Sequence, residues 1–103
     1  GLVEVLAPAP GEGPNEETIR TGSFEIELFA PHPEDPSCDL RALVTGDRDP
    51  GYGATSKMLA ESSICLAQND LLAPPGFLTP ASALGKNLIT RLISKAGIGF
   101  SIR

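Results

Sequence analysis

Proline divides this chain of 103 residues into short segments, and this division limits the fold more than any other sequence feature. Proline donates no hydrogen bond to a strand ladder and breaks a helix interior, so regular elements must lie between the prolines. Clusters fall at residues 8–14, 31–36 and 74–75, and single prolines stand at Pro50 and Pro80. The longest uninterrupted segments therefore lie in the second half of the chain.

Two segments before residue 50 have the alternation of a β-strand. In the run 23–30 apolar side chains alternate with Glu25 and Glu27, and in the run 39–46 they alternate with polar residues that include Arg41. A period of two places the apolar side chains on one face of a sheet. We therefore predict an antiparallel pair in which Glu25 or Glu27 faces Arg41.

Two helices are predicted in the second half, and each begins with a capping residue followed by proline. Asp49 precedes Pro50, and Thr79 precedes Pro80; proline fits the first helical position, where its missing N–H is not needed. The first helix is expected to end near residues 69–70. Apolar positions then recur at steps of three and four. The predicted inward stripes are Ala54, Met58, Glu61, Ser62 and Cys65, and then Leu84, Leu88, Ile89, Leu92, Ile93 and Ala96.

The second helix is expected to end at Gly97 and to lead into a closing strand with Ile98, Phe100 and Ile102. The predicted fold class is α+β, a small antiparallel sheet of about three strands with two helices on one face. The predicted order is strand, strand, helix, helix, strand. We expect the stripe residues Leu84, Leu88 and Leu92 to be buried against Phe24, Ile26, Leu28 and Phe100.

Residues 1–22 are predicted to be a mobile arm or docking loop, and residues 23–103 to form a single α+β domain. Between Ala7 and Gly22 the chain has three prolines, three glycines and only one large aliphatic residue. Such a segment cannot bury enough apolar area to offset the entropy of ordering. The apolar run at residues 2–6 is too short to assign to a strand or a helix.

Charge and hydropathy argue against several classes of function. Eight basic and thirteen acidic residues give a formal net charge of −5, whereas a nucleic-acid-binding protein needs a basic face. No apolar run approaches the roughly 18 residues of a membrane span, and no secretory signal opens the sequence. We therefore expect a cytoplasmic protein with no nucleic-acid partner and no membrane span. The start at Gly1, with Met58 as the only methionine, predicts a fragment of a longer protein.

The segment 46–57 is the main candidate for a binding surface. Free backbone N–H groups at a helix N-terminus attract anions, and glycine lets a ligand or another backbone approach closely. The alternative, which we favour, is that the glycines serve packing and that Asp49 caps the helix. Gly85, inside the second predicted helix, is explained in the same way by a close crossing with Gly53 or Ala54. The residues predicted to face a ligand or another domain are Asp49, Gly51, Tyr52, Gly53, Thr55 and Thr79.

No catalytic, cofactor-binding or metal-ligating residue is predicted. The sequence contains neither GxGxxG nor GxxxxGK[ST], the phosphate-binding patterns of nucleotide sites. His32 is the only histidine, and nothing places other ligands around it at the spacing of a zinc site. A nucleophilic pair of Cys38 and His32 would lack a third, orienting group. Cys65 is expected to be buried and Cys38 exposed.

Several segments together resemble the C-terminal end of the saccharopine dehydrogenase-like oxidoreductases, a group that includes bacterial trans-acting enoyl reductase relatives. The resemblance runs in order from Gly11. Its most specific parts are DPGYGATSKMLAE at 49–61 and LTPASALG at 78–85. The remaining matches are GEGP at 11–14, Leu66-Ala67, Leu92, Ala96-Gly97-Ile98 and Phe100.

The resemblance implies that this chain is the C-terminal domain of an NAD- or NADP-dependent oxidoreductase. Its partner would be the N-terminal dinucleotide-binding domain of the same parent chain. The family's glycine-rich cofactor motif has no counterpart here, and no catalytic residue is carried over. The isolated chain should therefore form substrate-side or interface structure, bind no cofactor and be inactive. The alternatives are a stand-alone binding or regulatory module, or a dimerisation module that forms a homodimer.

Overall fold

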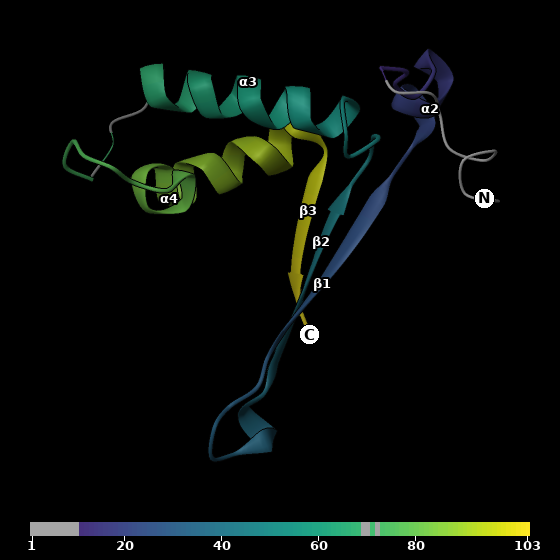
Figure 1. Cartoon of the computed structure of the whole chain (residues 1–103). Helices are drawn as coiled ribbons and strands as arrows, with labels where there is room; N and C mark the ends of the chain where they lie inside the picture. The colour runs from purple at the N-terminus through teal and green to yellow at the C-terminus, as the bar shows by residue number, and fades with distance from the viewer. Residues whose placement is uncertain (1–10, 69–70, 72) are drawn as a thin grey trace, which may run out of the picture.

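The computed structural model describes residues 11–68, 71 and 73–103, which form a three-stranded antiparallel sheet and two long helices (Figure 1). None of the described helices is both long and apolar enough to span a membrane. The predicted α+β class is confirmed, although the predicted order lacked the first helix. The elements are α2 (Glu16–Thr21), β1 (Phe24–Ala30), η1 (Pro36–Cys38), β2 (Leu40–Gly46), α3 (Gly53–Gln68), α4 (Pro80–Arg91), η2 (Leu92–Ala96) and β3 (Ile98–Ile102).

The sheet has the order β1-β2-β3, and both pairs are antiparallel. Arg41 of β2 lies directly opposite Phe29 of β1, with its guanidinium carbon 5.0 Å from the ring centre. Its Nη1 donates a hydrogen bond to Glu27 Oε1 at 3.3 Å, across the diagonal of the ladder. Of the two predicted partners of Arg41, Glu27 is therefore the one that pairs with it.

Two clusters of buried side chains form the core. The first joins Ala54 of α3, Ala96 of η2 and Ile98 of β3, with Phe24, Val44, Met58 and Leu92 packed around them. The second joins Cys65 of α3 to Leu84 and Leu88 of α4. Leu92 contacts both clusters and so connects the helix pair to the end of the sheet.

The predicted burial of Leu84 and Leu88 against the sheet is wrong in its partners. Both side chains are buried, but they pack with Cys65, because α4 lies beside α3 (Figure 1). The strands β1 and β2 run away from this helix pair, so Ile26 and Leu28 stay about half exposed. The helices therefore cover one end of the apolar face rather than the whole of it.

The start of α3 differs from the prediction, whereas the start of α4 agrees with it. Thr79 caps α4 by accepting a hydrogen bond from the Ser82 N–H at 3.2 Å, and Pro80 is the first helical residue. In contrast, α3 begins at Gly53, three residues after Pro50. The Asp49 carboxylate accepts the Tyr52 N–H at 2.7 Å and so closes a turn ahead of the helix. The end of α3 is Gln68, and residues 69–70 lie outside the described part.

Gly85 does not serve a close helix crossing, as the sequence suggested. A Cβ added there would meet no atom within 4 Å. Its backbone instead has φ +50° and ψ −134°, which kinks α4. Residues other than glycine rarely adopt this backbone conformation. At the other end of the same segment, Gly97 follows η2 in the left-handed conformation, as predicted.

The helix α2 lies inside the segment predicted as an arm without regular structure. Asn15 caps it by accepting the Thr18 N–H at 2.8 Å, and Glu16 and Glu17 occupy its first turn. Acidic groups are favourable there because of the helix dipole. The composition argument missed this helix, since capping and dipole effects act without burial. Residues 1–10 lie outside the described part, and the mobility of the arm stays a prediction.

We expect Leu88→Ala to lower the free energy of unfolding by about 2–5 kcal/mol, because the truncation leaves a cavity beside Cys65 and Leu84. Ile89→Ala is the matched control, since Ile89 is the next residue and is about half exposed. Its loss should stay below about 1 kcal/mol. Urea denaturation followed by circular dichroism measures both. Equally small losses would contradict the burial of Leu88.

Candidate functional site

Five of the six predicted site residues lie together at the start of α3. Asp49, Gly51, Tyr52, Gly53 and Thr55 occupy the turn before α3 and its first residues. Thr79 does not join them. It caps α4, whose first turn lies at the opposite end of the helix pair (Figure 1).

The polar groups of this turn are bonded to one another. The backbone N–H of Ala54 donates to Asp49 O at 2.8 Å, and the Thr55 hydroxyl donates to Pro50 O at 2.6 Å. The Tyr52 N–H is taken by the Asp49 carboxylate. The N–H groups of Tyr52 and Ala54, which an anion at this helix start would use, are thus already bonded, and the Asp49 carboxylate stands beside them. The geometry does not favour a phosphate here.

Gly53 instead allows α2 to pack closely against the start of α3. A Cβ at Gly53 would lie 2.7 Å from the carbonyl oxygen of Ile19 and 2.8 Å from Arg48 Cβ. The Asp49 N–H donates to the same Ile19 carbonyl at 3.3 Å. The described part of the predicted arm therefore docks on this chain's own turn. This contact supports the packing interpretation at Gly53, and a role facing a further domain stays a prediction.

The two helices are joined by an ion pair that lies mostly out of solvent. Arg91 Nε is 2.8 Å from Glu61 Oε2, and the side chains are 25% and 15% exposed. The sequence placed Glu61 on the inward stripe without naming a partner. The signal was present, because Arg91 lies within the second predicted helix, and it falls in the last turn of α4.

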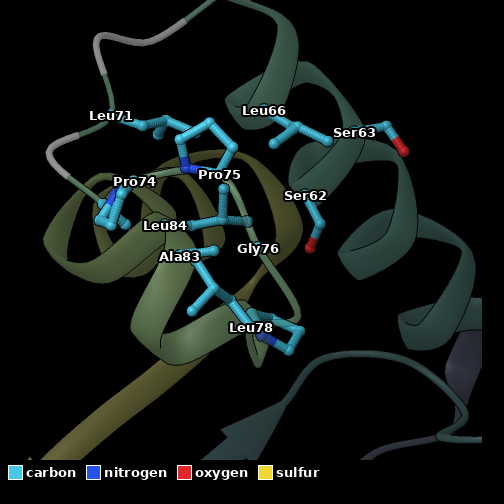
Figure 2. A pocket seen from close by; sticks show the side chains of 12 residues that line it. Ser62, Ser63, Leu66, Leu71, Pro74, Pro75, Gly76, Leu78, Ala83 and Leu84 are labelled. Carbon is cyan, nitrogen blue, oxygen red and sulfur yellow. The ribbon is translucent and has the colours of Figure 1, made fainter.

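An apolar pocket of about 520 Å³ lies between the C-terminal half of α3, the loop 73–78 and the first turns of α4 (Figure 2). Sequence reasoning missed it, because the prolines of this loop indicated only the end of a helix. Among its described lining residues, the polar side chains are those of two serines whose hydroxyls donate to α3 carbonyls, Ser62 to Met58 O and Ser63 to Leu59 O. The pocket is lined by Ser62, Ser63, Leu66, Leu71, Ala73, Pro74, Pro75, Gly76, Leu78, Pro80, Ala83 and Leu84.

This lining determines what the pocket can do chemically. Carbon atoms dominate it, and none of the described residues that line it has an acidic or basic side chain. This described lining suits an apolar group that needs exclusion from water. Thr79 lies between two lining residues, Leu78 and Pro80, and its hydroxyl is engaged with Ser82.

The loop that joins β1 to β2 does not form a nucleophilic pair. His32 Nδ1 accepts the Asp35 N–H at 3.0 Å, and Cys38 Sγ lies 3.6 Å from Asp35 Oδ2. Hydrogen bonds from the hydroxyl and N–H of Ser37 lower the pKa of the Asp35 carboxyl. Cys38 is exposed and Cys65 buried, as expected. Across the described residues, no group of three or more histidine, cysteine, aspartate or glutamate side chains could hold a metal ion.

Comparison with known proteins finds relatives in mycobacteria. A Mycobacterium tuberculosis protein provisionally named as a trans-acting enoyl reductase is 37% identical over 94 residues, which are 89% of this chain and 22% of that protein. The trans-acting enoyl reductase of Mycobacterium bovis is 37% identical over 93 residues, and that of Mycobacterium ulcerans is 31% identical over 93. These matches cover 88% and 87% of this chain. The chain thus spans about a fifth of the relatives it matches. No family model and no solved structure matches it.

We expect Gly53→Ala to lower the free energy of unfolding by about 1–3 kcal/mol, because the new Cβ would push α2 away from α3. The sign of this change in the free energy of unfolding is informative, because in a helix without such a contact alanine is more stabilising than glycine by about 1 kcal/mol.

Gly51→Ala is the control. A Cβ there meets only the Asp49 carboxylate, at 3.3 Å or more, and the change should stay within about 0.5 kcal/mol. Thermal and urea unfolding of both variants make the comparison. A more stable Gly53→Ala variant would mean that α2 does not pack at this position.

Proposed function

We propose that this chain is one domain of a larger NAD- or NADP-dependent oxidoreductase of the saccharopine dehydrogenase-like group. The observation that carries the proposal is the 37% identity, across 89% of this chain, to a protein named as an enoyl reductase of which the match spans only 22%. In this proposal the parent protein holds the cofactor in the part of its sequence outside the match.

The chemistry of the described residues supports a structural role in that enzyme. At the start of α3 the N–H groups of Tyr52 and Ala54 are already bonded and the Asp49 carboxylate lies beside them, which disfavours the pyrophosphate of a dinucleotide. The loop between β1 and β2 carries no paired nucleophile and base. The chain then contributes walls and interfaces, and hydride transfer takes place on residues of the remaining sequence.

The pocket between α3 and α4 is the part of the chain best suited to contact a substrate. An enoyl reductase acts on a carbon–carbon double bond. Transfer of a hydrocarbon segment next to that bond from water to an apolar surface is favourable. The carbon-rich lining of the pocket offers such a segment a compatible surface. Ser62 and Ser63 are both bonded to their own helix, so the surface adds little polar specificity.

Titration of NADPH separates this proposal from a cofactor-binding role for the chain. In the isotope-labelled chain, micromolar NADPH should cause no saturable amide shifts at residues 51–55, because the N–H groups of Tyr52 and Ala54 are already bonded. The full-length parent should bind NADPH and reduce an enoyl substrate.

Saturable shifts clustered at residues 51–55 would make the start of α3 a cofactor site and contradict the structural role. A folded parent protein that binds neither NADH nor NADPH would contradict the assignment to this class of oxidoreductase. The two results are independent, because the first concerns this chain and the second concerns the remaining sequence.

A further inference from the structure

The two faces of the sheet differ in chemistry. Residues directly opposite each other in an antiparallel ladder point to the same face. On one face, Ile26 lies opposite Val44 and Val44 opposite Phe100. In the next row, Leu28 lies opposite Ala42 and Ala42 opposite Ile102, and Ala30 and Leu40 form the last pair. This face carries no charged or polar side chain along its whole length.

The opposite face is polar. Its ionisable residues include Glu27 and Arg41, which form a hydrogen-bonded ion pair. Of its large apolar residues, Phe29 lies under the Arg41 guanidinium and Leu43 is half-buried. An antiparallel sheet commonly has one face in water and the other packed on a core. The polar face has the character of the face in water.

The helices of the described part of the chain cover only one end of the apolar face. Phe24, Val44 and Ile98 belong to the cluster around Ala54 and Ala96. Beyond these residues, β1 and β2 extend past the helices (Figure 1). The side chains left open form what we call the exposed apolar face: Ile26 (49% exposed), Leu28 (53%), Leu40 (56%), Phe100 (44%) and Ile102 (77%). Contiguous apolar patches of this kind mark interaction surfaces.

We infer that the exposed apolar face is a docking surface for the remaining sequence of the parent polypeptide, an inference that rests on the proposed function. The match spans 22% of a relative, so most of such a protein lies outside this chain and is available to cover the sheet. The core already begins this layer at Phe24 and Ile98, includes Val44 of the next row, and extends no further along the strands. A segment that continues the layer would complete a single core.

The chemistry of the face also defines what fits it. The chain has a net charge of −5, but the exposed apolar face contributes none of that charge. Electrostatic attraction therefore does not select the partner. An uncharged, apolar surface without polar positions is typical of permanent contacts, which resemble the interior of a domain. The covering segment should itself be apolar on the side that faces β1, β2 and β3.

Cysteine labelling in the full-length parent tests this surface with two matched pairs of neighbours. Leu28→Cys and Ile102→Cys place a thiol on the exposed apolar face, and Glu27→Cys and Ser101→Cys place one on the polar face. The alkylation rate of each thiol is read by peptide mass spectrometry, with the exposed Cys38 as an internal reference. The two apolar-face thiols should react about tenfold or more slowly than their neighbours, because only opening of the contact exposes them.

Equal rates within the Ile102 and Ser101 pair would overturn the inference. That pair decides even if Leu28→Cys does not fold, because Ile102 is the most exposed of the five residues. Protection that appears only as the protein concentration rises would assign the face to a second copy, which also overturns it. Protection in a parent protein that binds no NADPH would sustain the docking surface and reject the proposed oxidoreductase function.

Discussion

The rest of the structure depends on the contact of Ala54 with Ala96 and Ile98, which connects α3 to η2 and to the sheet. All three are buried, and the two alanines are small enough for α3 and η2 to approach closely. Ile98 is the first residue of β3, so the same contact fixes where the sheet leaves the helices. The Glu61–Arg91 ion pair then holds α3 and α4 together further along, where the second core cluster lies. Removal of one partner of such a shielded ion pair leaves the other charge poorly solvated and unpaired, which destabilises the fold.

Local patterns were sufficient wherever one segment determines its own structure. Alternation predicted β1 and β2, because a period of two specifies an extended chain with one apolar face. Thr79 and Pro80 predicted the start of α4, because the bond from the Ser82 N–H lies within one turn. Asp49 and Pro50 present the same chemistry, yet they form a turn outside the helix. The Asp49 N–H bonds to Ile19 of α2, a contact that no local pattern contains.

Long-range packing also explains what the sequence could not give at the candidate site. The glycine at position 53 indicated a close approach, but only the fold identifies the approaching group as the Ile19 carbonyl. The pocket arises where the loop 73–78 folds between two helices, so its lining is scattered from Ser62 to Leu84. Helical periodicity predicted the burial of Leu84, Leu88 and Cys65, whereas the contact of the two leucines with Cys65 was not predicted. Periodicity identifies which face is inward, and topology decides what that face meets.

The kink at Gly85 separates the part of α4 that lines the pocket from the part that is tied to α3 by the Glu61–Arg91 ion pair. Pro80, Ala83 and Leu84 stand before the kink and line the pocket, whereas Arg91 stands after it and is tied to Glu61. The part of α4 before Gly85 and the part after it are consequently two short helical segments rather than one continuous helix. A tilt of the segment before Gly85 would change the width of the pocket, while the Glu61–Arg91 ion pair and the contact of Ala54 with Ala96 stay in place. The shape of the pocket, together with the packing of Leu84 on Cys65, can thereby change without a change in the Glu61–Arg91 ion pair or in the cluster of Ala54, Ala96 and Ile98.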